Sequence, residues 1–286
     1  MLAKRTVHGT IKPGKTSGKK TEYRERKRKM AYLRIEYYSQ ALHRTTAFEI
    51  LVPNDPREGM PEPSQPMKTL FLLHGYTGKA GNWVPEDLPA KYNFAIVMPN
   101  AENSFYLDGL SSGHAFQTMV GVELVDYVRK TFGLAERPDD TYIAGLSMGG
   151  FGALHTGLAY PDRFGKIGAL SSALIVHEVA TMKPGQGNAV ANYEYYRECF
   201  GDPATAAERD CNPEVLARKL KADGKTIPGI YMACGTEDFL IENNRAFHKF
   251  LTDEEIPHEY HEGKGIHDMV FWTEHIRNAV EWMFNS

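Results

Sequence analysis

The sequence has few cysteines. Its 286 residues contain 3, Cys199, Cys211 and Cys234, and no two of them form a CxxC pair. Secreted domains held together by disulfides are much richer in cysteine, so we do not expect a disulfide framework. We expect Cys199 and Cys211 to be free thiols, the alternative being a disulfide between them. Free thiols suit a reducing compartment.

Long apolar runs are also lacking. None reaches the roughly 20 residues that cross a bilayer, and the first residues hold no apolar segment of the signal-peptide kind. We therefore expect a cytoplasmic protein without a membrane span. Histidines, cysteines and carboxylates do not cluster at metal-site spacing, so we expect no metal and no cofactor. The 42% apolar content is sufficient for a sizeable core.

Acidic residues are scarce at the start of the chain. Residues 1–29 hold 11 lysines and arginines against 2 acidic residues, a net charge of +9, and the remainder carries −12. Almost no apolar side chain interrupts the basic arm, so we predict a disordered N-terminal extension at 1–29 and a folded domain at 30–286. The alternative is an arm that contacts nucleic acid or an anionic surface. The acidic remainder argues against nucleic acid as the main partner.

Short apolar runs alternate with helical patterns along residues 30–286. Tyr32–Gln40 and Thr45–Pro53 alternate like an antiparallel strand pair at a sheet edge, and a proline-rich surface loop follows. The runs KTLFLLHG, FAIVMPN, TYIAGL, KIGALSS and GIYMACG suit strands that are buried on both faces. Helical periodicity covers 116–128 and the C-terminal 272–283. This order predicts an α/β fold, a mostly parallel central sheet with helices on both faces.

Residues 176–212 interrupt this alternation. They contain glycines, a tyrosine-rich short helix and no recognisable strand. Such an insertion is expected over the carboxyl edge of the sheet, where these folds bind ligands. We predict a short lid-like insertion, the alternative being a connection without function.

The stretch TYIAGLSMGGFGAL places Ser147 between glycines where an apolar strand meets a helix. Gly145-Leu146-Ser147-Met148-Gly149 matches G-x-S-x-G, in which a sharp strand-to-helix turn exposes a nucleophilic serine. The alternative is a glycine-rich packing turn. A serine needs a base to accept its proton and donors to hold an oxyanion. In this layout the donors are the backbone amides of Met148 and of Tyr76, which follows an early strand.

The acid and the histidine base should follow the serine in that order. Asp238 and Glu237 both come directly after the strand GIYMACG, and spacing does not separate them. His267 lies in a loop before the last helix, the expected place for the base. Five other histidines are expected to be structural or at the surface: His74, His248, His258, His261 and His275. Asp268, next to His267, is expected to cap the last helix.

These motifs together resemble the α/β-hydrolase superfamily. More narrowly, they are similar to the esterase D / tributyrin-esterase-like group, which includes S-formylglutathione hydrolases, acetyl esterases and feruloyl esterases. The resemblance runs from Tyr32 to the C-terminus and is carried by LLHGYTG, MPNAENSFYLD, GLSMGGFGAL, CGTEDFL and GIHDMVFWTEHI. It implies the α/β-hydrolase fold, a triad of Ser147, Asp238 and His267, and oxyanion donors at Tyr76 and Met148.

The resemblance also implies a serine carboxylesterase that cleaves short-chain or aryl acyl esters through an acyl-enzyme. A thioesterase of the S-formylglutathione hydrolase type is the first alternative, and a non-catalytic binding protein on the same scaffold is the second. The expected partner is a small-molecule ester, and a homo-oligomer stays an alternative to a monomer. Side chains expected to line the pocket follow strands on the serine's edge of the sheet: Trp83, Phe105, Tyr106 and Asp108. Tyr193, Tyr195 and Tyr196 are expected to cover it.

Overall fold

The computed structural model describes residues 30–53, 66–83 and 85–285. The predicted basic extension at 1–29 and most of the proline-rich loop lie outside these ranges. Eight strands form one sheet in the order β1-β2-β4-β3-β5-β6-β7-β8. In chain order they are β1 (Met30–Ser39), β2 (Arg44–Pro53), β3 (Thr69–Leu73), β4 (Ala95–Pro99), β5 (Thr141–Leu146), β6 (Lys166–Leu170), β7 (Gly229–Gly235) and β8 (Glu259–Gly263).

The strand directions follow the sequence pattern. β1 and β2 pair antiparallel along their whole length, which confirms the predicted edge pair. β2 also runs antiparallel to β4, and all the later pairs are parallel. Every residue of β3, β4 and β5 is buried, as expected for central strands covered on both faces.

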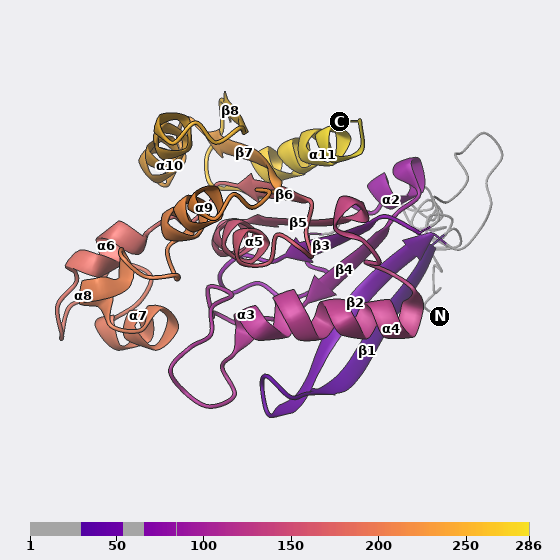
Figure 1. Ribbon diagram of the computed structural model, residues 1–286, viewed down its shortest axis with the longest axis horizontal. Coiled ribbons are helices and arrows are strands. Elements are labelled where there is room, and N and C mark those ends of the chain that lie inside the picture. The colour runs from indigo at the N-terminus through magenta and orange to yellow at the C-terminus, as the bar shows by residue number, and fades with distance from the viewer. Residues whose placement is uncertain (1–29, 54–65, 84, 286) are drawn as a thin grey trace, which may run out of the picture.

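Helices cover both faces of the sheet (Figure 1). One face packs on α2 (Leu88–Tyr92) and α11 (Met269–Asn285). The other face packs on α3 (Phe116–Thr118), a π-helical stretch η1 (Met119–Leu124), α4 (Val125–Phe132), α5 (Met148–Ala159), α9 (Pro213–Ala222) and α10 (Ile241–Asp253). A 3₁₀ turn, η2 (Pro138–Asp140), precedes β5. The predicted helix at 116–128 therefore exists but contains a π-helical interruption.

The insertion is helical. It holds α6 (Val176–Thr181), α7 (Tyr193–Phe200) and α8 (Pro203–Ala206), which lie together at one end of the molecule in Figure 1. Asn192 caps α7 by accepting a hydrogen bond from the Tyr195 backbone N–H, and Asp202 caps α8 in the same way. The tyrosine-rich helix predicted here is α7. No helix in the described ranges is long and apolar enough to cross a membrane.

Candidate active site

Ser147 lies on the sharp turn between β5 and α5. Its backbone has φ 56° and ψ −119°, a conformation that costs energy for a residue with a side chain. A Cβ added at Gly145 would lie 2.1 Å from the Gly149 carbonyl oxygen, and one at Gly149 would lie 2.5 Å from the Leu73 carbonyl oxygen. Both glycines of the G-x-S-x-G motif are therefore required by close backbone contacts.

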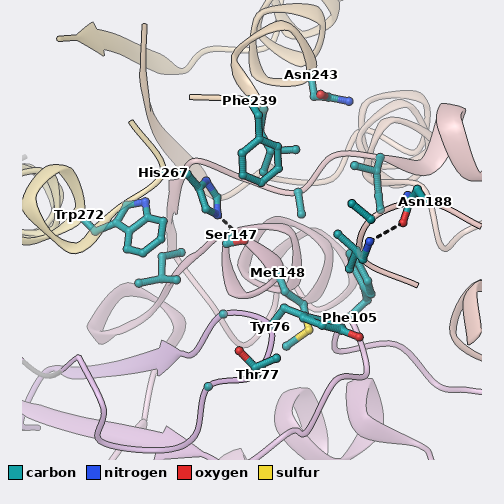
Figure 2. Close-up of a pocket in the computed structure, with 18 of the residues that line it drawn as sticks. Tyr76, Thr77, Phe105, Ser147, Met148, Asn188, Phe239, Asn243, His267 and Trp272 are labelled. Carbon is teal, nitrogen blue, oxygen red and sulfur yellow. Dashed lines mark hydrogen bonds between the residues drawn. The ribbon is translucent and has the colours of Figure 1, made fainter. Parts of the chain in front are cut away.

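Backbone hydrogen bonds hold this strained turn. The Ser147 N–H donates to the Leu170 carbonyl at 2.8 Å, and the Ser147 carbonyl accepts from Ala173 and Phe151, both at 3.0 Å. The main chain of Ser147 is thus tied to β6 and α5, while its hydroxyl faces a cavity (Figure 2). Such over-determination is how a protein keeps a strained residue in place.

His267 connects the serine to a carboxylate. Its Nε2 lies 3.0 Å from Ser147 Oγ, and its Nδ1 lies 2.8 Å from Oδ2 of Asp238. These three side chains come from the turn after β5, the loop after β7 and the loop before α11. The geometry allows the hydroxyl proton to pass to Nε2 while the carboxylate holds Nδ1–H.

The structure distinguishes Asp238 from Glu237. Asp238 is 2% exposed and accepts a hydrogen bond from the Leu240 N–H at 2.9 Å, whereas Glu237 is exposed. Burial alone raises the pKa of the Asp238 carboxyl, but hydrogen bonds from His267 and Leu240 outweigh burial and lower it below its ordinary value. The carboxylate beside His267 is therefore ionised at neutral pH.

His74 has a structural role at the end of β3. Its Nδ1 lies 2.8 Å from the Gly75 carbonyl oxygen, and its Nε2 accepts a hydrogen bond from the Ala101 N–H at 3.1 Å. Burial lowers the pKa of His74, which keeps the ring neutral. This ring fixes the loop that carries Tyr76 beside Ser147 on the cavity wall.

A cavity of about 660 Å³ opens above Ser147 and His267. Figure 2 shows Trp272 on one side of Ser147 and Phe105 with Asn188 on the other. The rings of Phe239 and Trp272 contact the His267 ring, with centroids at 4.5 Å and 4.7 Å. This wall is mostly apolar and aromatic, as is usual for small-molecule pockets.

The predicted pocket residues divide into two groups. Trp83 and Phe105 line the cavity. Tyr106 does not: it is 0% exposed and its hydroxyl donates to the His74 carbonyl at 2.9 Å, so its predicted pocket role is wrong and it supports the His74 loop from below. Asp108 is also corrected, because its carboxylate accepts hydrogen bonds from Thr118 away from this cavity.

The insertion supplies part of the cavity wall, with Glu178, Asn188, Val190 and Tyr196 among its lining residues. Of the three tyrosines expected to cover the site, Tyr196 lines the cavity directly. Tyr195 acts indirectly, with its ring 5.9 Å from that of Tyr76 and its hydroxyl bonded to the Asn103 carbonyl at 2.7 Å. Tyr193 is not among the lining residues.

The lining residues that were not predicted include Phe239, Trp272, Glu178 and Asn243. Only the position of Phe239 directly after Asp238 offered a sequence signal. Four further histidines for which a structural or surface role was predicted behave as expected. His248 Nδ1 lies 2.7 Å from His258 Nε2, His261 stacks on Tyr231, and His275 stacks on Phe271. Asp268 caps α11 by accepting hydrogen bonds from Val270 and Phe271.

The cysteines are free thiols in the structure, as predicted for Cys199 and Cys211. Burial raises the pKa of Cys199 and of Cys234 to about 12. Neither thiol is therefore a nucleophile at neutral pH. The described residues contain no group of three or more histidines, cysteines or carboxylates that could hold a metal ion.

Comparison with known proteins relates the chain to esterases. A family model described as "Putative esterase" matches residues 39–283. An acetyl esterase of Caldicellulosiruptor saccharolyticus is 41% identical over 261 residues, which cover 89% of this chain and 98% of that protein. Among solved structures, the fluorophosphonate-binding serine hydrolase F of Staphylococcus aureus has a TM-score of 0.78 at 28% identity and covers 90% of this chain and 99% of its own. An S-formylglutathione hydrolase of the same organism has a TM-score of 0.75 at 27% identity, with the same coverage.

Proposed function

From the premise that the chain belongs to this esterase family and is a serine hydrolase of carboxylic esters, we propose that it cleaves short-chain or aryl acyl esters with Ser147, His267 and Asp238 as its triad. The observation that carries the proposal is the 3.0 Å contact between His267 Nε2 and Ser147 Oγ. The bidentate contact of Asp238 with Nδ1, at 2.8 and 3.0 Å, supports it.

In the first step, Ser147 Oγ attacks the ester carbonyl carbon while its proton passes to His267 Nε2. The tetrahedral intermediate then collapses, the C–O bond to the alcohol breaks, and Nε2–H gives its proton to the leaving oxygen. Water repeats the sequence on the acyl-enzyme and releases the acid and free Ser147. Throughout, the Asp238 carboxylate holds Nδ1–H and stabilises the imidazolium.

The oxyanion would be held by backbone N–H groups of Met148 and Tyr76. Met148 is the first residue of α5, and the first N–H groups of a helix have no acceptor within the helix. The Ser147 N–H is already bonded to Leu170, so it does not compete. Each such donor contributes on the order of 3 kcal/mol to transition-state stabilisation.

A short acyl chain or an aryl group fits the cavity. Its volume of about 660 Å³ suits a small ester, and Trp83, Phe105 and Phe239 offer aromatic contacts. The acetyl esterase relative points to the same size class. We also propose that the insertion at 176–212 is a lid-like wall, since Asn188, Val190 and Tyr196 line the cavity.

A fluorophosphonate probe tests the triad. We expect wild-type labelling that Ser147→Ala abolishes and that Ser172→Ala, a buried serine on the neighbouring strand end, retains. Hydrolysis of p-nitrophenyl acetate should follow the same pattern. If the wild type neither takes up the probe nor hydrolyses this ester, the proposal fails.

S-formylglutathione hydrolysis is the second candidate, because a hydrolase of that thioester is among the similar structures. Turnover of S-formylglutathione compared with acetate, butyrate, octanoate and methyl ferulate esters separates the two. The remaining alternative, a non-catalytic binding protein, is incompatible with the chain being a carboxylic ester hydrolase.

A further inference from the structure

The cavity wall carries an unusual charge balance. Among the described residues that line it, Glu178 is the only one with a carboxylate, and none is a lysine or an arginine. Among these described lining residues, a substrate therefore meets one carboxylate, that of Glu178, and no lysine or arginine. The sign of that charge should matter for substrates that are themselves charged.

Glu178 is held in place without an ion pair. The Asn243 side-chain amide donates to Glu178 Oε1 at 2.8 Å and to the Leu174 carbonyl at 3.3 Å, so α10 and α6 fix the carboxylate together. Within the part of the chain that the structure describes, no basic side chain forms an ion pair with Glu178. The nearby carboxylates differ: Glu242 pairs with Arg245 at 2.8 Å, and Glu214 Oε1 lies 2.9 Å from His177 Nε2.

Further carboxylates lie beyond the main cavity. A neighbouring cavity of about 270 Å³ shares Glu178 and Asn243 with it and is also lined by Glu214 and Glu242. Burial raises the pKa of the Tyr196 hydroxyl, and the charge of Glu178 adds to that rise. The field of Glu178 thus reaches a side chain on the insertion side of the main cavity.

The alcohol part of an ester faces this wall. Its leaving oxygen must lie near His267 Nε2 to receive a proton, and the His267 ring contacts Phe239. Figure 2 shows Phe239 and Asn243 together on one side of Ser147, opposite Tyr76 and Thr77. A group attached to the leaving oxygen then lies on either the Trp272 side or the Phe239 side of the His267 ring, and on the Phe239 side it faces the Asn243–Glu178 pair.

We propose that Glu178, held by Asn243, is a specificity-determining residue that makes the enzyme prefer esters of neutral or cationic alcohols over esters of anionic ones. This inference rests on the proposed function. It also disfavours glutathione thioesters, because glutathione has two carboxylates and one ammonium group and is a net anion at neutral pH.

Three acetate esters of similar size test the proposal: 3,3-dimethylbutyl acetate, acetylcholine and 2-sulfoethyl acetate. They are neutral, cationic and anionic, and acetate release gives kcat/KM for each. For unit charges on the order of 8 Å apart in an effective dielectric constant of about 40, we expect about fivefold between successive esters and about 25-fold between cation and anion. The order should be choline, then dimethylbutyl, then sulfoethyl.

Glu178→Gln keeps an acceptor for Asn243 and removes the charge, so we expect the cation-to-anion ratio to fall to within about threefold of unity. Glu178→Lys should reverse the ratio. Glu194→Gln, on the exposed side of α7, is the matched control and should keep the wild-type ratio. Raising the salt from about 0.01 M to about 1 M shortens the screening length from about 30 Å to about 3 Å and should weaken the wild-type preference.

A wild-type ratio near unity, or a ratio that Glu178→Gln leaves unchanged, would overturn the inference. Those results differ from a failure of the proposed function. If the proposed function failed, the neutral ester would not be hydrolysed at all and Ser147 would not take up the fluorophosphonate.

Discussion

Asp238→Asn should disable the base without disturbing the fold. The Leu240 N–H donates to Oδ1 of Asp238 at 2.9 Å, so in the variant it fixes the amide oxygen at that position. The amide NH₂ then occupies the Oδ2 position, 2.8 Å from His267 Nδ1. Because an NH₂ group only donates, the closer of the two contacts, 2.8 Å against 3.0 Å to Oδ1, makes Nδ1 the acceptor and moves the ring proton to Nε2.

The consequence is a histidine in the wrong tautomer. Nε2 lies 3.0 Å from Ser147 Oγ, and once protonated it cannot accept the serine proton. A tautomer change of this kind lowers kcat about 10⁴-fold in a serine triad, which corresponds to about 5.4 kcal/mol. We expect p-nitrophenyl acetate hydrolysis and fluorophosphonate labelling to fall together, while the melting temperature stays within about 4 °C of wild type.

Glu237→Gln is the matched control, because Glu237 precedes Asp238 in the chain but is exposed. It should keep kcat within about twofold of the wild-type value. A loss of less than tenfold in Asp238→Asn, or an equal loss in Glu237→Gln, would refute the assignment of Asp238 as the acid that orients His267.

Three further outcomes follow from the geometry. Gly149→Ala places a methyl group against the Leu73 carbonyl and should lower the free energy of unfolding by about 1–3 kcal/mol. It should also lower kcat, because it shifts the Met148 and Tyr76 amides. Gly224, the control, has φ +63°, and a Cβ added there would have no atom within 4 Å. Gly224→Ala should therefore lower the free energy of unfolding by about 1 kcal/mol in a melting experiment and keep full activity. Similar activity losses in the two variants would contradict this reasoning. Phe239→Ala removes a ring that is 71% exposed and contacts His267, so kcat/KM for aryl esters should fall about two- to tenfold more than for alkyl esters. Val270→Ala, 78% exposed, should not discriminate between them. Burial lowers the pKa of His155 to about 4, so between pH 6.5 and 4 the imidazole is protonated in the unfolded chain and neutral in the folded chain. The neutral His155 ring contributes fully to the free energy of unfolding above pH 6.5. This stability is lost as the pH falls towards 4, by about 2–3 kcal/mol between pH 7 and 4.5. In urea unfolding, the free energy of unfolding of His155→Gln should depend less on pH than that of the wild type. Parallel pH curves for the two proteins would contradict this prediction.

The sequence was informative wherever a local pattern has one physical cause. Fully buried strands appear as continuous apolar runs, and the runs predicted as β3 to β7 are all strands of the sheet. The glycines around Ser147 signalled a turn too tight for side chains, and the contacts of Gly145 and Gly149 explain them. The family resemblance is confirmed by the match over residues 39–283.

Sequence reasoning was weaker where neighbours in the chain point in opposite directions. Glu237 and Asp238 are adjacent carboxylates, and only the turn after β7 buries one and exposes the other. Phe105 and Tyr106 show the same limit. Both have positive φ, yet Phe105 lines the cavity while Tyr106 is buried beneath it. Backbone torsions in a loop decide such cases, and composition or spacing does not encode them.

The sequence by itself determined the order of strands and helices, the serine on its turn and the region of the chain that supplies each partner, because these depend on local periodicity and on glycines. The tertiary structure decided which side chains meet. It brings His267 to Ser147 across 120 positions of sequence and Asn243 to Glu178 across 65. Parallel strands end at one edge of the sheet, so residues distant in the chain converge there, and the contact of Asn243 on α10 with Glu178 on α6 holds that carboxylate at the cavity wall.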